Sequence, residues 1–489
     1  MSGAPVLVDA TGASPLDAAG IADTVDAVLN QLELLPAGGY TPRPLSEHRW
    51  RAWGGRTGAE LIAACGTPGP SMPVQVCNGM GVDSAAIITE LVENPDARLL
   101  LVPDDGGGQR LIRVDLADIT IVTAMTGDEF DETRAAMEEY LLPTLRAAGI
   151  RTVQISRGGQ SQDDGVVVLD DSRSPAGMVM HGPWRLRDEL LAAGTVPQTA
   201  SNARRCSARA KGWPLDEWAK RPDAYGDGHR VVVDRAHVIG FAAEESNRVA
   251  KDRSYAADCR RPVYPLRQWG WDRDWCIDYL YARFGIVWPR SCCTYCPFAG
   301  GSSAKNQRVA ARWRREPAGG ALAVGLELVA LALNPRMALY KRVTARSVAR
   351  QHGLTTVLDL VEHHLRTSQW AVYDVRRVHR PYGARKDNPG DPTRKGQTWR
   401  SVRTLRTGAR EEMTAQLAGT HVGRLEPGVT PRLWLREAPA TYPSPERFIV
   451  AAPAGVEDKE QDGFPALWAA AIAAHGPAGR LTEKEVDAA

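Results

Sequence analysis

The chain has 489 residues, of which 24% are charged, and a formal net charge of +2 at pH 7. This length is enough for two or three domains with a sizeable core, so neither a disulfide nor a metal is needed merely to hold the fold together. The near balance of charge favours no particular partner, and any basic surface must therefore be local.

The ends and the apolar stretches bear on location. The first residues, MSGAPVLVDATGASPLD, lack the positive segment and apolar core of a secretory signal, so we expect a cytoplasmic protein. The longest apolar stretch, 319–333, is interrupted by Glu327 and is too short to span a bilayer. We therefore expect a buried helix there and no membrane partner.

Eight cysteines are unevenly placed, and none lies in the last 193 residues. In a reducing compartment they are expected to be thiols, ligands of a metal or cluster, or nucleophiles. They are Cys65, Cys77, Cys206, Cys259, Cys276, Cys292, Cys293 and Cys296.

In chain order, residues 1–70 form an expected N-terminal extension with one helix, 21–35. A short apolar strand then begins at Val74 and leads into CNGMGVDS. Gly79 and Gly81 allow a tight turn, and Asp83 stands where a helix begins. Amide groups and the positive end of that helix would converge on one point, which suits a pyrophosphate. The alternative is an ordinary turn between strand and helix.

The following pattern alternates between strands and helices. This alternation predicts βαβ units, and hence an α/β fold with a doubly wound, mostly parallel sheet and helices on both faces. The turn PDDGGGQR is expected to connect a hairpin. Ligands bind at the carboxyl ends of such strands, where CNGMGVDS and TGDEFDET both lie. The expected strands are 74–77, 99–102, 111–114, 119–124, 152–155, 166–169 and 237–241, and the expected helices are 84–92, 133–148 and 184–193.

The segment NARRCSARAKGW gathers cations around one cysteine, Cys206. Arg204, Arg205, Arg209 and Lys211 would lower the pKa of a nearby thiol and could also bind phosphate. The alternative is a basic solvated helix with an incidental cysteine.

A second cysteine motif, CCTYCPF, lies at residues 292–298. Such turns present thiolates to zinc or to an iron–sulfur cluster, with Cys293 and Cys296 as the pair and Cys276 and Cys206 completing a set of four. Cys292 could replace Cys293 or be a reactive thiol beside the site. Buried cysteine pairs in turns are the alternative.

Five motifs in this order resemble the PP-loop ATP pyrophosphatases, also called adenine nucleotide alpha-hydrolase-like proteins, in their phosphoadenosine phosphosulfate (PAPS) reductase-like branch. VCNGMGVDS resembles the family's Ser-Gly-Gly-x-Asp-Ser loop, and TGDEFDET its Thr-Gly-x-Glu element. CSARAKGWPL, IGFAAEES and the stretch from YPLRQWGW to CCTYCPF follow. The resemblance covers about residues 70–300.

The resemblance implies a five-stranded parallel sheet, ATP with Mg²⁺ as cofactors, and a set of roles. Asn78, Gly79, Met80, Gly81, Asp83 and Ser84 would hold the pyrophosphate of an adenine nucleotide, and Thr126, Gly127 and Glu129 would lie near the nucleotide. Asp83, Ser84, Arg205 and Lys211 would act in catalysis.

Departures from the family pattern narrow the implied activity. Asn78 replaces Ser and Met80 replaces Gly, although Met80 could still offer its backbone N–H. No cysteine follows Cys296, and Ala242 replaces an expected Arg, which disfavours sulfonucleotide reduction. The resemblance then shifts to sulfurtransferases that thiolate tRNA or install phosphorothioate in DNA, with a [4Fe-4S] cluster or, alternatively, Zn²⁺ on the cysteines and a cysteine desulfurase as sulfur donor. The alternative is a nucleotide-sensing subunit of a larger assembly that has lost turnover.

The remainder of the chain is expected to be helical over 301–365 and to form a basic domain over 366–489. Residues 366–410 carry 12 Lys and Arg against three Asp, interleaved with Trp370, Tyr373, Tyr382 and Trp399. Cations with aromatic faces suit DNA or tRNA. The alternative is a basic β-hairpin that packs on the core. A strand at 448–450 and a helix at 466–474 are also expected.

Overall fold

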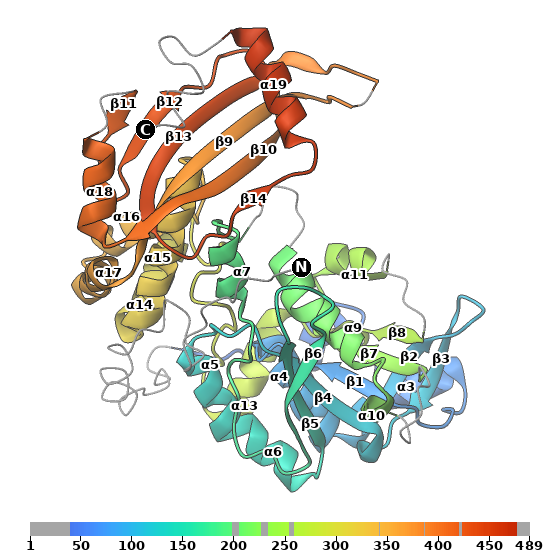
Figure 1. Ribbon diagram of the computed structural model, residues 1–489. Helices are drawn as coiled ribbons and strands as arrows, with labels where there is room; N and C mark the ends of the chain where they lie inside the picture. The colour runs from blue at the N-terminus through green and yellow to red at the C-terminus, as the bar shows by residue number, and fades with distance from the viewer. Residues whose placement is uncertain are drawn as a thin grey trace. The chain divides into compact units, whose positions relative to one another are not determined.

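The computed structural model describes residues 40–197, 205–225, 233–253, 259–341, 343–385, 387–419 and 423–476. They form two compact units (Figure 1). Residues 40–187 and 205–294 make up the parallel-sheet unit, and residues 188–197 and 295–476 make up the antiparallel-sheet unit. The helix expected at 21–35 and the last residues of the chain lie outside the described residues.

A six-stranded sheet in the order β6-β5-β4-β1-β7-β8 forms the centre of the parallel-sheet unit. The five strands from β5 to β8 run parallel, and β6 pairs antiparallel with β5 at one edge. The mixed α/β class and the mostly parallel sheet are thus confirmed. The strands are β1 (Val74–Cys77), β4 (Ile119–Ala124), β5 (Arg151–Arg157), β6 (Val166–Ser172), β7 (Arg235–Val238) and β8 (Arg260–Val263).

The expected hairpin is present but does not join the parallel sheet. Strands β2 (Leu99–Pro103) and β3 (Gln109–Arg113) pair antiparallel with each other and form a separate two-stranded sheet. The turn at residues 104–108 is closed by the Asp104 carboxylate, which accepts from the N–H groups of Gly106 and Gly108 at 2.9 and 2.8 Å.

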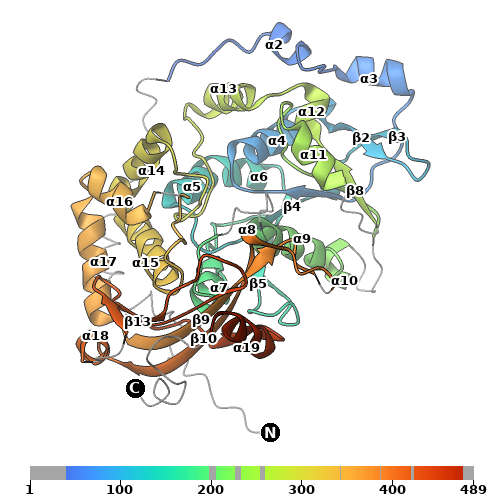
Figure 2. The ribbon, with the colours of Figure 1, turned by 90° about the horizontal axis from the view of Figure 1, so that it is seen from above.

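Helices cover both faces of the parallel sheet (Figure 2). The helices α4, α6, α12 and α13 share one apolar core with β1 and β4. On the other face Trp218 of α9 packs against Val122 and Val153. The helix expected over 133–148 is broken into α5, a π-helical turn (η3) and α6.

The helical segments of this unit are α2 (Glu47–Arg51), α3 (Gly58–Cys65), α4 (Val82–Glu93), η1 (Pro95–Arg98), η2 (Leu116–Asp118), α5 (Asp131–Ala136), η3 (Met137–Leu141), α6 (Leu142–Ala147), α8 (Arg205–Ser207), η4 (Ala208–Gly212), α9 (Trp213–Trp218), α10 (Pro222–Tyr225), α11 (Ser246–Arg253), α12 (Pro265–Trp269) and α13 (Arg273–Phe284), and α7 (Leu186–Ala192) follows at its boundary.

The strand order determines where this unit can bind a ligand. The chain runs from β1 through β4 to β5 on one side, then returns to β7 and β8 on the other side of β1. At such a switch point the loops that leave neighbouring strands diverge and open a crevice at their carboxyl ends. The loops after β1, β4 and β7 all emerge at this edge.

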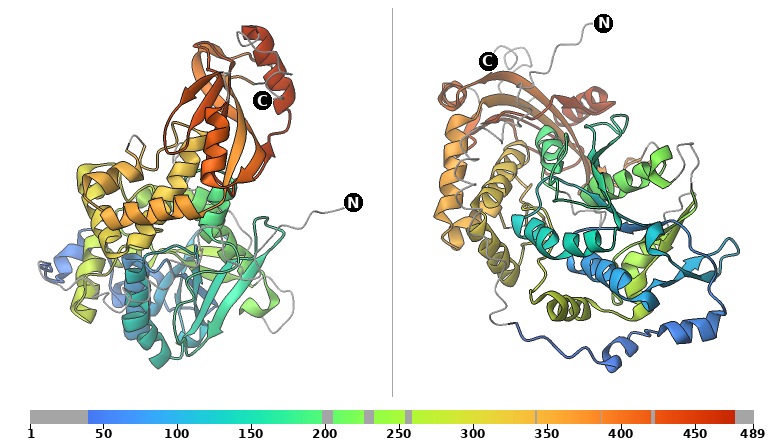
Figure 3. Two further views of the ribbon diagram at one scale, coloured as in Figure 1. Left: turned by 60° about the vertical axis from the view of Figure 1, so that its left-hand side comes forward. Right: turned by 90° about the horizontal axis from the view of Figure 1, so that it is seen from below.

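The antiparallel-sheet unit is built on a sheet in the order β11-β12-β13-β9-β10-β14. Its longest strands, β9 (Trp370–Tyr382) and β10 (Asp391–Gly408), form a hairpin, and the orange and red strands make a curved sheet in both views of Figure 3. The remaining strands are β11 (Arg424–Glu426), β12 (Arg432–Arg436), β13 (Ser444–Pro453) and β14 (Lys459–Glu460), and the helices are α14 (Ser303–Arg315), α15 (Pro317–Leu333), α16 (Ala345–Gln351), α17 (Thr355–Thr367), α18 (Arg410–Ala418) and α19 (Phe464–His475).

The apolar helix α15 is buried, as the sequence predicted. Its only acidic residue, Glu327, is fully buried and accepts from the backbone N–H groups of Leu339 and Arg346 at 2.7 and 3.3 Å. Within the described ranges, no single helix is long and apolar enough to cross a membrane, and the pair α14 and α15, which passes that test jointly, is bent by 120°.

The structure corrects one expectation for the basic segment. Trp370 and Tyr373 are 0% and 1% exposed, so they cannot stack on nucleic-acid bases. Both lie in β9, a central strand of its sheet, where β13 and β10 flank it and residues of both faces are covered. Tyr382 is 52% exposed and keeps that possibility.

Candidate functional site

The loop after β1 is shaped by Asn78. Its side-chain oxygen accepts from the Met80 N–H at 2.9 Å, and its side-chain nitrogen donates to Thr123 Oγ1 of β4 at 2.9 Å. The loop is therefore tied both to itself and to the neighbouring strand. The Met80 N–H, which the sequence led us to expect near phosphate, donates to Asn78 in this structure.

Met80 adopts a backbone conformation that normally requires glycine. Its φ is +58°, in the left-handed region, and its side chain is 1% exposed in the core beneath the sheet edge. The Trp288 indole N–H donates to the Met80 carbonyl at 3.1 Å and holds this conformation. A methionine is thus accommodated at a glycine position by its own burial and by contacts from a distant segment.

Helix α4 directs its N-terminus toward the loop. Its N-cap residue is Gly81, with extended backbone, and among the described residues no side chain caps the first turn. Helix N-termini carry unsatisfied N–H groups and partial positive charge, which favour an anion. Ser84 is 6% exposed, and its hydroxyl donates back to the Gly81 carbonyl at 3.0 Å.

Asp83 is engaged by a residue that the sequence did not single out. Arg273, the first residue of α13, donates to its two carboxylate oxygens at 2.5 and 3.3 Å, and Glu245 lies 3.7 Å from the same guanidinium. Burial raises the pKa of Asp83, although Arg273 opposes the shift. Gly240, after β7, approaches so closely that an added Cβ would lie 3.2 Å from the Ser84 nitrogen. The three segments are therefore packed together at this point.

The loop after β4 presents the predicted residues Thr126, Gly127 and Glu129. Gly127 has a φ of +98°, and an added Cβ would lie 2.7 Å from the Arg185 side chain, so glycine is required. The Thr126 hydroxyl donates to Glu129 Oε1 at 3.3 Å. The side chain of Glu129 is 1% exposed and faces the interior of the site.

Lys211 reaches this loop from the π-helical turn η4. Its Nζ lies 2.9 Å from Glu129 Oε1. Burial lowers the pKa of Lys211, but the Glu129 carboxylate opposes this effect, and the net shift is upward, so the amine stays charged. Its side chain as a whole is 29% exposed. Arg205, at the start of α8, is exposed.

Residues 291–294 connect the two loops. The Ser291 hydroxyl donates to the Gly79 carbonyl at 2.5 Å and lies 3.4 Å from Glu129 Oε2. Cys293 pairs with Glu129 in an antiparallel bridge, and the Thr294 N–H donates to the Asp128 carbonyl at 2.9 Å. Cys293 Sγ lies 3.3 Å from Thr126 Oγ1. A segment more than 150 residues away in sequence thus joins the loops after β1 and β4.

The thiol of Cys293 is neutral in this environment. Burial raises its pKa well above the usual value and Glu129 adds to the shift, while Lys211 and the contact with Thr126 oppose it. Ser291 was not predicted as a site residue, and its only sequence signal is its place directly before the two cysteines.

The four predicted metal-ligating cysteines are not assembled as a cage. Cys276 is 0% exposed in the apolar core that α4 shares with β1. In the part of the chain that the structure describes, no group of three or more His, Cys, Asp or Glu side chains is arranged to hold a metal ion. These described side chains therefore do not fit an iron–sulfur cluster or zinc.

The carboxylates beside the loop are the groups that could hold a magnesium ion. Mg²⁺ is commonly bound by one or two carboxylates together with the phosphates of the substrate, and it needs no preformed cage. Asp83 and Glu129 are the carboxylates near the loop, and each is already paired with a cation.

Comparison of the chain with family models, with curated proteins and with solved structures found no match.

Proposed function

We propose that the parallel-sheet unit binds ATP at the carboxyl ends of β1 and β4 and cleaves it between the α and β phosphates, adenylating an acceptor for sulfur transfer. The observation that carries the proposal is the convergence of four elements on one point. The uncapped N-terminus of α4, the turn 78–81, the Lys211–Glu129 pair and the segment 291–294 all meet there. This arrangement, and the strand order of the sheet, support a PP-loop fold.

In the proposed reaction an acceptor oxygen attacks the α phosphorus of ATP. The bond from that phosphorus to the bridging oxygen breaks, and pyrophosphate leaves. The N-terminus of α4 and the ammonium of Lys211 would stabilise the charge that develops on the phosphate oxygens. Bound Mg²⁺ would supply further charge stabilisation through the same phosphates. A sulfur nucleophile then attacks the adenylated acceptor atom and AMP leaves.

Cys293 supports the sulfur-transfer step. Its thiol lies beside Thr126 and Glu129, in the same loop cluster as Lys211. To receive sulfur, Cys293 would first lose its thiol proton, and its thiolate would then attack the outer sulfur of a donor persulfide and release the donor thiolate. DNA or tRNA as the acceptor and a cysteine desulfurase as the donor belong to this proposal.

Release of pyrophosphate from ATP in the presence of Mg²⁺ tests the proposal. Lys211→Met should lower the rate by on the order of 100-fold, the usual loss when one charge-stabilising donor is removed. Lys220→Met is the matched control, since Lys220 is 60% exposed and pairs with Glu217, three residues earlier at the end of α9. Equal rates for the two variants would overturn the assignment of Lys211.

A second candidate function is nucleotide sensing without turnover. It is favoured because the polar groups of the site already have partners within the protein. Asn78 accepts from the Met80 N–H. Asp83 is paired with Arg273, and Glu129 is paired with Lys211. ATP-dependent thermal stabilisation that Lys211→Met weakens, without pyrophosphate release under any condition, would favour sensing over catalysis.

A further inference from the structure

The end of the β9–β10 hairpin carries a pocket that the proposed nucleotide chemistry does not use. Its volume is about 370 Å³, within the range of small-ligand sites. The pocket lies in the antiparallel-sheet unit and is lined by Arg380, Pro381, Tyr382, Gly383, Ala384, Lys395, Gly396 and Gln397.

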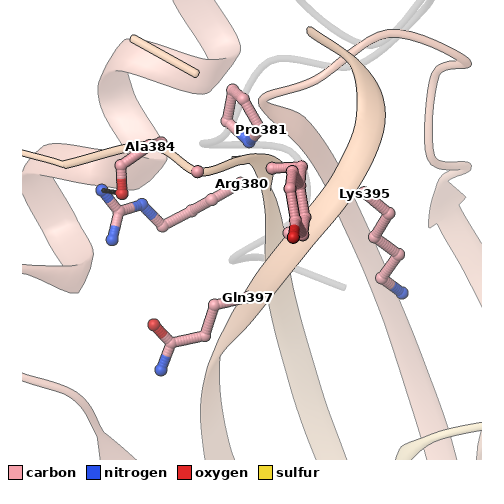
Figure 4. A pocket seen from close by; sticks show the side chains of 8 residues that line it. Arg380, Pro381, Ala384, Lys395 and Gln397 are labelled. Carbon is pink, nitrogen blue, oxygen red and sulfur yellow. Dashed lines mark hydrogen bonds between the residues drawn. The ribbon is translucent and has the colours of Figure 1, made fainter. Parts of the chain in front are cut away.

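Cations stand on two sides of this pocket (Figure 4). Arg380 and Gln397 lie on one side, where the Arg380 guanidinium donates to the Ala384 carbonyl at 3.4 Å, and Lys395 lies on the other. A single small anion would be held by clustered cations. Separated cations instead suit an extended ligand with repeated negative charges.

The nearby carboxylates do not cancel this charge. The Asp391 side chain accepts from the N–H and the hydroxyl of Thr393 at 2.9 and 2.6 Å. Glu446 is 4% exposed and pairs with Arg377 at 2.7 Å and His379 at 3.4 Å. The ammonium of Lys395 has no carboxylate partner within hydrogen-bonding distance among the described residues.

An aromatic ring lies at the edge of the same pocket. Tyr382 is 52% exposed, and the Arg394 guanidinium lies over its ring at 4.2 Å from the centroid. Arg380 lies over the ring of Trp399 at 5.4 Å. Exposed rings beside cations are the elements with which proteins hold unpaired bases and the phosphates between them.

We propose that the end of the β9–β10 hairpin binds single-stranded nucleic acid, with a base on Tyr382 and neighbouring phosphates on Arg380 and Lys395. The inference is independent of the nucleotide loop, because no residue of the parallel-sheet unit takes part in it. A duplex is disfavoured, since stacked and paired bases cannot present a face to Tyr382.

The experiment is fluorescence anisotropy of the full chain with a labelled single-stranded oligothymidine of about 12 nucleotides, a length within the usual site size. Tyr382→Ala should weaken binding by on the order of tenfold, and Tyr382→Phe, which keeps the ring, should bind as wild type. Lys395→Ala should reduce the slope of log affinity against log salt by about one ion.

Two control variants test whether binding depends on this pocket rather than on positive charge elsewhere in the protein. Arg406→Ala removes a cation on the same hairpin, but Arg406 pairs with Val372 at the opposite end and with Glu412, so binding should stay as in wild type. Lys220→Met removes an exposed cation of the parallel-sheet unit and should also leave binding unchanged. Equal binding of duplex and single strand, or equal loss in Arg406→Ala and Lys395→Ala, would overturn the proposal.

A third control concerns folding. Arg377 is unsuitable as a test residue, because it is 5% exposed and pairs with Glu446, so its removal would disturb the core. Tyr382 is half exposed, and thermal unfolding of Tyr382→Ala should match that of Tyr382→Phe closely. Loss of binding with unchanged unfolding supports a ligand contact, and unchanged binding in a folded Tyr382→Ala protein contradicts it.

Discussion

Lys211 Nζ lies 2.9 Å from Glu129 Oε1, and this pair joins the π-helical turn η4 to the loop after β4. The side chain of Glu129 is 1% exposed, whereas that of Lys211 is 29% exposed. The carboxylate therefore depends on the ammonium for neutralisation. A buried charge that loses its partner is costly, which makes the pair testable by stability as well as by activity.

Removal of Lys211 should destabilise the protein more than its exposure suggests. We expect Lys211→Met to lower the free energy of unfolding by about 3 kcal/mol, because Glu129 would remain buried and unpaired. Adding Glu129→Gln should restore part of that loss, which gives a coupling energy of about 1–3 kcal/mol in a urea-unfolding cycle. The exposed Lys220–Glu217 pair is the control and should show a coupling below about 1 kcal/mol. A coupling near zero for Lys211 and Glu129 would mean that the ion pair is not formed in solution.

Met80 leads to a second prediction, in which glycine and alanine exchange their usual order. Both Met80→Ala and Met80→Gly remove a buried side chain and should cost about 2–5 kcal/mol. Because the φ of Met80 is +58°, Met80→Gly should be the more stable of the two by about 1 kcal/mol.

The matched control for this comparison is Met137. It is equally buried at 1% exposure, but its φ is −64°. Met137→Ala should therefore be more stable than Met137→Gly by about 1 kcal/mol. Chemical denaturation of the four variants measures both differences. The same order at both positions would contradict the left-handed conformation of Met80.

The strands at the centre of the parallel sheet could be predicted closely from the sequence. The bounds predicted for β1 and β4 from apolar runs between turn residues are the same as the observed bounds. Fully buried parallel strands can be recognised by their apolar composition alone. The hairpin of β2 and β3 was also predicted, but its separation from the main sheet was not, since pairing partners depend on contacts far apart in sequence.

Side-chain contacts within the site were less predictable. The prediction that the residues after β1 and β4 lie at one edge of the sheet is confirmed. The ion pair of Lys211 with Glu129 was not predicted, because no local sequence pattern encodes it. The use of the Met80 N–H by Asn78 depends on one rotamer, which composition cannot show. The burial of Trp370 and Tyr373 depends on neighbouring strands and helices. It could therefore not be predicted from the basic and aromatic composition of the segment.

Cys293 should react slowly with alkylating agents, and Glu129 should control the rate. Burial and the Glu129 carboxylate both raise the pKa of the Cys293 thiol, so little thiolate is present near neutral pH. Glu129→Gln should lower that pKa and speed alkylation severalfold, up to about tenfold, whereas Lys211→Met should raise it and slow the reaction.

Iodoacetamide labelling followed by mass spectrometry measures this, in a Cys292→Ser background that leaves one thiol in the pair. Exposed Cys65 should react faster than Cys293 in the native protein, and buried Cys276 should stay slow in every variant. If neither Glu129→Gln nor Lys211→Met changes the alkylation rate of Cys293, its thiol does not face the Lys211–Glu129 pair.

Lys395 should acylate at an unusually low pH. Burial lowers its pKa to about 8, and repulsion from Arg377 and Arg336 adds to the shift, while Glu446 opposes it. An ordinary lysine titrates near about 10.4. The folded state therefore disfavours the charged amine, and this cost is present below pH 8 and relieved as pH rises toward the value of the unfolded chain.

Trace labelling with acetic anhydride across pH, read by mass spectrometry, should give a midpoint near 8 for Lys395. Arg336→Ala removes an exposed cation and should move the midpoint upward, since one source of repulsion is lost. Bound oligothymidine should move it upward as well, because phosphate stabilises the ammonium. A Lys395 midpoint near the ordinary lysine value of about 10.4, insensitive to Arg336→Ala, would contradict the partly buried position of Lys395 beside these cations.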